Sequence, residues 1–415
     1  MKKISTQLTL FMIFILFISF QLLPLQSEAQ AKDSTFRPGG KIWGLVYADY
    51  FYKSHADQLS RGSYQYSKLS GDISAFQYRR VYLGYNYSIT KKFSAQILLA
   101  AENDAQASKS GVSKGAAGDV LVNNNFAPYI KFANLRWKDI WKGTDLVIGG
   151  TLTPTIEAAS EPTWVYRSVE RTILDFNKTN PFDYGIKLQG KFDPLTRNFG
   201  YDVMVGNGTN AVPENDKYKW FYGDLWAKLF DKKLWIDVFA DYNKIGYTDN
   251  NLSYPHSRNA WKITLAYVTD PFTIGVEGFI TDNKNDVGGV HISGTAKDTT
   301  VLNAAARGIS LYAHGTILKN KLAFFVRYDN FNPDTKYDNT KYVTYTVPAG
   351  NVYEPNTRTN FITTGLDITP AKNVHFEPNI WYVRYSGQQK NLSGVAAHDY
   401  DMVWRMTFYF VFGSK

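Results

Sequence analysis

The stretch DMVWRMTFYFVFGSK, residues 401–415, decides the fold because its side chains alternate in character. Trp404, Phe408 and Phe410 belong to an apolar set, whereas Arg405 lies in the interleaved polar set. A β-strand sends successive side chains to opposite faces. One face of this strand is therefore almost wholly apolar, and we expect it either to pack on a core or to meet lipid.

The first 31 residues have the form of a secretory signal. Two lysines precede a long apolar run at 8–25, and the small-residue site Ala29-Gln30-Ala31 follows it, which predicts cleavage after Ala31. The alternative is an uncleaved anchor, because the run is long enough to span a bilayer. Cleavage would remove two lysines and one glutamate and lower the formal net charge from +9 to +8. Residues 32–39 would then lead into a single domain, 40–415.

The rest of the chain has no apolar run of the length that a transmembrane helix needs. It could cross a membrane only as a closed barrel, because only helices and barrels satisfy every backbone group in lipid. The chain has no cysteine, and 16% of its residues are aromatic. Aromatic residues favour strands and form the girdles of membrane barrels.

Runs of about ten residues with the same alternation recur along the chain. In LWIDVFADYN, for example, Ile236 and Val238 alternate with Asp237 and Asp241. Candidate strands lie near 40–52, 75–88, 93–102, 127–137, 145–153, 184–192, 199–207, 220–230, 234–243, 258–268, 272–282, 305–317, 322–331, 357–368, 374–385 and 399–412. An even number of about 16 strands predicts an all-β, transmembrane antiparallel β-barrel.

The connections between these strands fall into two length classes. Short turns lie at 89–92, 231–233, 270–271, 318–321 and 370–373. Long loops lie near 53–74, 103–126, 154–183, 208–219, 244–257, 283–304, 332–356 and 386–398. Short periplasmic turns and long extracellular loops are typical of outer-membrane barrels. The alternative is a secreted soluble β-sheet protein, but its turns would not sort in this way, and a propeller would show a repeat of about 40–50 residues.

A barrel of 16 strands encloses a water-filled lumen, and we therefore expect small solutes to pass through it. The third long loop, 154–183, is the longest, and its aromatic content argues against disorder. We predict that it folds into the lumen and constricts the channel, with its charged side chains facing the opening. The alternative is that it packs over the rim. The predicted constriction residues are Trp164, Tyr166, Arg167, Glu170 and Arg171.

Two segments resemble the phosphate-selective porin superfamily (O/P-type), and most nearly its members from Bacteroidetes-type bacteria. They are FQYRRVYLGYNYSITKKF at 76–93, with the Arg79-Arg80 pair, and EPTWVYRSVERTILDFNKTNPFDYGIKLQGKF at 161–192. The resemblance implies a trimeric, 16-stranded porin in the outer membrane of a Gram-negative bacterium, with an inward third loop and diffusion of anions or small nutrients. Members with true phosphate selectivity line the pore with a ladder of basic residues.

That ladder is only partly present here, because the alternation turns seven basic residues inward against eight acidic ones, namely Asp224, Asp237, Asp241, Glu277, Asp329, Asp367, Glu377 and Asp401. The predicted pore-lining residues are Arg80, Lys187, Lys191, Lys228, Lys262, Arg327, Arg405, Asp237, Asp241 and Glu277. The alternation does not assign Lys131, Arg136, Arg258, Arg307 and Arg384 to a face, and we expect them to point inward or to lie at the rims. The charge pattern predicts a weak anion preference at most.

Other functional classes have less support. A sugar-specific channel could use inward aromatic residues as a stacking track, and the candidates are Trp164, Trp235, Phe239, Phe325 and Tyr409. The six histidines show no metal-ligand spacing, and Ser310 and His314 would lie about 13 Å apart on one strand face. We expect no enzyme activity, metal, cofactor or nucleic-acid partner. The expected partners are outer-membrane lipid, small solutes and further copies of the chain.

Overall fold

The computed structural model describes residues 36–62, 64–67, 69–102, 128–177, 179–214, 216–246, 255–293, 296–337, 342–346, 357–387 and 398–413. The chain divides into two compact units, Met1–Pro38 and Gly39–Lys415, and the second unit holds all the strands. The predicted signal segment lies outside the described residues. No helix within the described ranges is long and apolar enough to cross a membrane.

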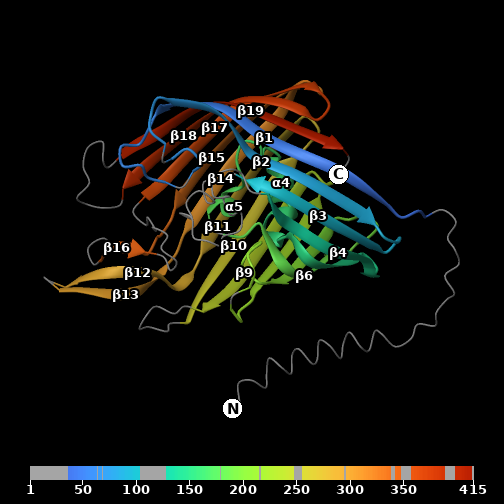
Figure 1. Ribbon diagram of the computed structural model, residues 1–415, viewed down its shortest axis with the longest axis horizontal. Coiled ribbons are helices and arrows are strands. Elements are labelled where there is room, and N and C mark those ends of the chain that lie inside the picture. Colours follow the sequence, from blue (N-terminus) through green and yellow to red (C-terminus); the bar gives the residue numbers. More distant parts are fainter. Residues whose placement is uncertain are drawn as a thin grey trace, which may run out of the picture. The chain divides into compact units, whose positions relative to one another are not determined.

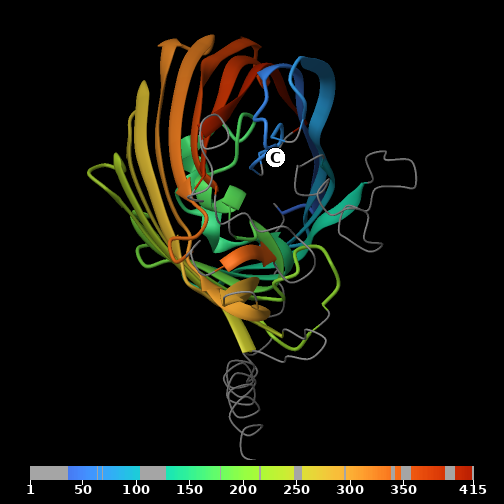
Figure 2. The same cartoon turned by 90° about the vertical axis from the view of Figure 1, so that its left-hand side faces the viewer.

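Sixteen strands form a closed antiparallel barrel, which confirms the predicted architecture (Figures 1 and 2). They follow one another in chain order, and β19 pairs with β1 to close the sheet. The barrel strands are β1 (Gly39–His55), β2 (Ile73–Ser88), β3 (Phe93–Glu102), β4 (Tyr129–Trp141), β5 (Thr144–Leu152), β6 (Phe182–Lys191), β7 (Phe199–Gly206), β8 (Trp220–Leu229), β9 (Leu234–Gly246), β10 (Pro255–Val268), β11 (Phe272–Thr281), β14 (Arg307–Leu318), β15 (Leu322–Asn332), β17 (Thr357–Ala371), β18 (Val374–Gly387) and β19 (His398–Gly413).

Three further strands lie beyond the barrel wall at one end of it (Figure 1). β12 (Asn283–Ser293) and β13 (Ala296–Ala304) form a hairpin, and β16 (Tyr342–Thr346) pairs with β12. The segments 283–304 and 332–356 connect barrel strands as predicted, but they also contain strands, which the alternation did not indicate. Their Gly, Asn and Asp content is typical of loops, but antiparallel pairing between two neighbouring connections orders their backbones as strands.

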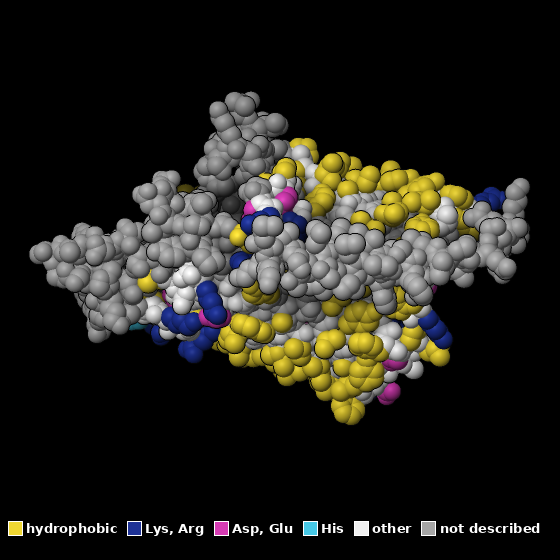
Figure 3. Space-filling model, turned by 90° about the horizontal axis from the view of Figure 1, so that it is seen from below, with side chains coloured by type: hydrophobic (Ala, Val, Ile, Leu, Met, Phe, Trp, Pro, Cys, Tyr) yellow, Lys and Arg dark blue, Asp and Glu magenta, His cyan; other side chains and the backbone are white. Residues whose placement is uncertain are grey.

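The alternation of the C-terminal stretch agrees with its place in the wall. In β19, Arg405 and Thr407 are buried inside the barrel, whereas Trp404 and Phe410 are 48% and 39% exposed on the outside. The described outer face is broadly apolar, as the yellow surface in Figure 3 shows. This is the pattern of a barrel whose outer wall meets lipid.

The short turns lie at the end of the barrel where β1 begins, since Gly39 pairs with Ser88 immediately before the turn at 89–92. Asn320 and Asn373 occupy left-handed conformations in two of these turns, with φ of 59° and 65°. Asparagine tolerates this conformation better than most residues do. The sequence therefore supplies suitable residues where the chain reverses most tightly.

Candidate functional site: the lumen and its third loop

The third loop, residues 153–181 between β5 and β6, lies inside the ring of strands (Figure 2). It contains the short helices α3 (Pro154–Glu157), α4 (Ser160–Trp164) and α5 (Ile173–Asn177). Pro154 begins α3, where a missing backbone N–H costs little. Val165 ends α4 in a left-handed conformation, with φ of 55°. A β-branched residue adopts this conformation only when its surroundings impose it.

Two apolar clusters hold the third loop against the inner wall. Ile173 and Leu174 are fully buried in a cluster with inward aromatic side chains of β8, β9, β11 and β15. Trp164 lies in a second cluster with Tyr312 of β14 and Phe325 of β15. Full burial of one such aliphatic side chain contributes about 1.5–3 kcal/mol. The loop is therefore packed as part of the protein core.

Charged residues of the wall hold the backbone of the same loop. The ammonium group of Lys262 lies 2.7 Å from Asp237 and donates a hydrogen bond to the carbonyl of Thr155 at 2.6 Å. The guanidinium of Arg327 donates to the carbonyl of Arg171 at 2.5 Å. All these side chains are buried. Their side chains point into the barrel, where the third loop covers them and they stabilise it.

The tip of the third loop reaches strands on the far side of the lumen. Ser168 donates from its hydroxyl to Glu377 of β18 at 2.9 Å, and its carbonyl accepts a hydrogen bond from Arg79 of β2. Arg405 of β19 donates to the carbonyl of Val169 at 3.1 Å. The loop therefore crosses the lumen and is attached at both sides.

The first loop, residues 56–72, also enters the lumen, which the sequence analysis did not predict. Tyr64 stacks on Phe176 of the third loop, with ring centroids 4.6 Å apart. Tyr66 makes an edge contact with Trp381 of β18 at 5.1 Å. Both tyrosines are buried. The two tyrosines are the feature of the sequence that indicates this inward course, because aromatic side chains bury large apolar areas.

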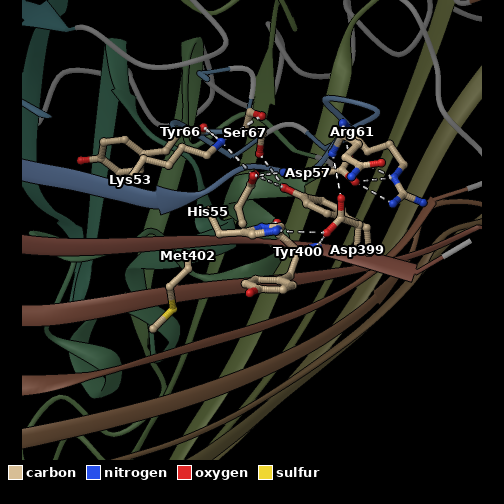
Figure 4. A network of polar contacts seen from close by, with 12 residues as sticks. Lys53, His55, Asp57, Arg61, Tyr66, Ser67, Asp399, Tyr400 and Met402 are labelled. Atoms are coloured by element: carbon tan, nitrogen blue, oxygen red, sulfur yellow. Dashed lines mark hydrogen bonds and ion pairs between the residues drawn. The ribbon is translucent and has the colours of Figure 1, made fainter. Parts of the chain in front are cut away.

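A polar network fixes the start of the first loop to β1 and β19 (Figure 4). Lys53 and Asp401 form a buried ion pair at 2.8 Å. The same carboxylate accepts the backbone N–H of Asp57 at 2.9 Å, and Asp57 pairs with Arg61 at 2.7 Å. Burial alone would raise the pKa of Asp57, but the hydrogen bonds and charge of Arg61 hold it below its ordinary value.

A second cluster lies on the neighbouring strands β2 to β4, around Glu102 at the end of β3. Lys131 of β4 lies 2.6 Å from this carboxylate, and Arg80 of β2 lies 3.8 Å from it. Tyr82 and Tyr129 donate their hydroxyls to it. Among the described residues, one acid is therefore in contact with two cations.

Two β-bulges bring these cations inward. The register between β1 and β2 skips Arg79, and as a result both Arg79 and Arg80 are buried. The register between β3 and β4 skips Lys131, and both Lys131 and Phe132 are buried. A bulge lets two successive residues share a face. Strict alternation could not show this, and it left Lys131 without an assigned face.

Arg167 is the predicted constriction residue that retains clear access to the lumen, with its side chain 17% exposed. It pairs with Asp175 at 2.7 Å and with Glu161. Its charge also acts on Lys131 and Tyr82 of the Glu102 cluster. Trp164, Tyr166, Glu170 and Arg171 are buried within the packed loop.

The predicted pore-lining residues have different environments. Those held beneath the third and first loops are Lys262, Arg327, Arg405, Asp237, Asp241 and Glu277. Lys187 is buried and pairs with Glu157 of α3. Lys228 lies over the ring of Trp235 at 3.4 Å, and Lys191 lies at the same short-turn end of the barrel. Arg80 belongs to the Glu102 cluster.

Three of the five aromatic residues considered for a sugar track are closed to stacking. Phe239, Phe325 and Trp164 are fully buried under the third loop. Trp235 is covered by Lys228, and Tyr409 packs edge-on against Tyr47 at 5.2 Å. A sugar ring needs an exposed aromatic face for stacking, and the three buried side chains offer none.

Comparison with solved structures places the barrel among outer-membrane porins in fold. The DcaP channel of Acinetobacter baumannii matches with a TM-score of 0.59 at 10% identity, over 90% of this chain and 97% of that one. An anion-selective porin from Comamonas acidovorans matches with a TM-score of 0.56 at 12% identity, over 91% and 100%. OmpT of Vibrio cholerae matches with a TM-score of 0.54 at 10% identity, over 91% and 99%. Neither a protein-family model nor a curated protein sequence matches the chain.

Proposed function

We propose that the protein is a porin of a Gram-negative outer membrane, through which small hydrophilic solutes diffuse passively. The observation that carries this proposal is the third loop, which is packed inside a closed barrel of porin fold and attached at both sides of the lumen. Such a loop narrows the opening to a fixed aperture, and the charges beside that aperture then decide which ions pass. Passive diffusion of this kind requires no chemical reaction.

The charges beside the aperture support at most a weak preference for anions. Arg80 and Lys131 share one acid, Glu102. Arg167 faces them from the third loop, but its charge is offset by Glu161 and Asp175. Three cations thus lie beside three acids among these described residues, and a preference for anions is at most slight.

We also propose that the chain is a member of the phosphate-selective porin superfamily and forms a homotrimer. The two segments that carry the resemblance meet in space, because Arg79 binds the carbonyl of Ser168. One neighbouring structure, OmpT of Vibrio cholerae, is described as a trimer form. Chemical cross-linking in membranes tests the oligomeric state, and a purely monomeric product would contradict it.

Planar-bilayer recording tests the channel function itself. Purified protein should insert with stepwise, ohmic conductance, and a salt gradient should give a small reversal potential of the anion-selective sign. A sugar-specific channel would instead show saturable block by an oligosaccharide. Absence of conductance from folded barrels would contradict the porin function, and a cation-selective reversal potential would contradict the anion preference.

A further inference from the structure

A shallow apolar groove of about 1040 Å³ crosses the outer face of β8, β9, β10, β11 and β14. It is distinct from the lumen, because the side chains that form it point outward. Its walls are formed by Val203, Leu225, Val238, Trp261, Ile263, Ile280 and Ile309, and its floor by Gly223, Ala240 and Gly278. The groove therefore opens on the surface that the proposed function exposes to lipid.

The residues that line the groove lie on two neighbouring rows of paired residues, and Leu225, Val238, Ile263, Gly278 and Ile309 form one of them. Val203, Gly223, Ala240, Trp261, Ile280 and Arg307 are successive partners on β7, β8, β9, β10, β11 and β14. Neighbouring strands lie about 4.8 Å apart, and five steps give a length of roughly 24 Å. One leaflet of the hydrocarbon core is about 15 Å thick, half of the bilayer's ~30 Å. The groove is thus long enough for an extended acyl chain.

The floor of the groove is open because Gly223 and Gly278 carry no side chains. A Cβ atom added at Gly223 would meet nothing closer than the carbonyl of Ala240 at 3.9 Å, and one at Gly278 nothing closer than the carbonyl of Gly308 at 4.0 Å. No turn or tight backbone contact requires either glycine. The space they leave can therefore hold part of a ligand.

A cation lies at one end of the row. Arg307 is exposed at the start of β14, at the long-loop end of the barrel, and it borders the groove. No ion pair of Arg307 occurs within the described ranges. Asp224, Lys262, Phe239 and Phe279 also border the groove, but their side chains are buried inside the barrel. The groove therefore combines an apolar trough with a positive charge at its extracellular end.

We propose that this groove binds an acyl chain of a phosphorylated lipid of the outer leaflet, whose phosphate lies at Arg307. This proposal rests on the proposed location in an outer membrane. A guanidinium and a phosphate form strong, charge-assisted hydrogen bonds. Two-fold pairing of the groove with the same face of a second copy would instead bring one apolar, cationic surface against another, with no acid in the groove to compensate.

Native mass spectrometry of the detergent-solubilised full chain tests the site, with bisphosphorylated lipid A as the probe and phosphatidylcholine as the neutral comparison. The wild type should retain one tightly bound lipid A. The double variant Gly223→Leu/Gly278→Leu fills the floor and should bind it about tenfold more weakly, and Arg307→Gln should show a similar loss. The matched controls are Ala95→Leu, at another outward small residue on β3, and Arg384→Gln, at another exposed arginine on β18. Both should bind as the wild type does.

Unchanged lipid A binding by the filled variant would overturn the proposal, and so would equal losses in the two controls. Equal retention of phosphatidylcholine would overturn the role of the phosphate. A dimer or trimer mass that disappears in the filled variant would show that another copy of the chain occupies the groove instead. Conductance is recorded in parallel: lipid binding by a barrel that does not conduct would contradict the proposed function and leave the lipid site intact.

Discussion

Arg79 of β2 donates a hydrogen bond to the backbone carbonyl of Ser168, at the tip of the third loop. The same guanidinium forms a buried ion pair with Asp49 of β1 at 2.5 Å. Much of the third loop packs on β7 to β15, whereas Phe176 of α5 packs in a cluster with Phe361 of β17 and Trp381 of β18. Arg79 is therefore one of the few groups that hold the tip of the loop across the opening.

Replacing Arg79 by glutamine should free the tip of the third loop without preventing barrel assembly. Loss of one partner of a buried ion pair typically costs about 3–5 kcal/mol, and that cost falls on Asp49 of β1, while the loop tip loses its hydrogen bond at Ser168. We expect single-channel current that fluctuates between two levels. Arg136→Gln is the control, since Arg136 pairs with Asp145 outside the loop. Steady current at the wild-type level in Arg79→Gln would show that the tip is held by other contacts.

Replacing residues 160–176 by a short Gly-Ser linker should enlarge the aperture. The deleted segment carries α4 and most of α5, and it fills part of the lumen. We expect single-channel conductance to rise severalfold, because the current then passes the full barrel width. Heat-modifiable migration on gels verifies that the barrel is still folded. Unchanged conductance in a folded variant would mean that the constriction lies elsewhere.

The Glu102 cluster should set the sign of ion selectivity. Glu102→Gln removes the acid that Arg80 and Lys131 share, and it should move the reversal potential toward anions. Lys131→Gln removes a cation at the same point and should move it the opposite way. The two variants control for each other, because they alter one ion pair from opposite sides. Reversal potentials that shift in the same direction in both variants would show that the Glu102 cluster does not set ion selectivity.

The anchor of the first loop should weaken in acid. Arg61 holds the folded-state pKa of Asp57 below the ordinary value of about 3.9. A lowered pKa contributes stability that is present above the unfolded-state value and is lost as the pH falls through the folded-state value. The difference in unfolding midpoint between wild type and Asp57→Asn should therefore be constant above about pH 5 and shrink below about pH 4. Arg61→Gln should follow the same curve, and a difference independent of pH would contradict this assignment.

The closing strand should be essential for assembly. Residues 408–413 of β19 pair with Trp43–Ala48 of β1, and their removal leaves the barrel with unpaired edges that lipid cannot satisfy. A chain without 408–415 should therefore give no folded, heat-modifiable form in membranes. Normal insertion of this truncated chain would argue against closure between β1 and β19.

The sequence predicts the barrel well because alternation and turn length are local signals. Arg405 and Trp404 fall on opposite faces, as a period of two requires. The site is harder to predict, since it depends on departures from that period. A skipped residue in the register turns Arg79 inward beside Arg80, and another turns Lys131 toward Glu102. Such bulges leave no trace in the alternation itself.

Burial under a loop is also a long-range property. Lys262 and Arg327 face inward, as their strands indicate, but the sequence does not show that the third loop covers them. The inward course of the first loop depends in the same way on aromatic partners far along the chain, such as Trp381 for Tyr66. Inward orientation can therefore be predicted from sequence, whereas access to the aperture cannot.

The most direct test of the central claim is a planar-bilayer recording of the purified wild-type chain beside the variant that lacks residues 160–176. We predict stepwise conductance for both, with the larger steps in the variant, and a small anion-selective reversal potential for the wild type. Folded barrels that give no conductance, or equal conductance for the two proteins, would contradict a water-filled channel constricted by the third loop.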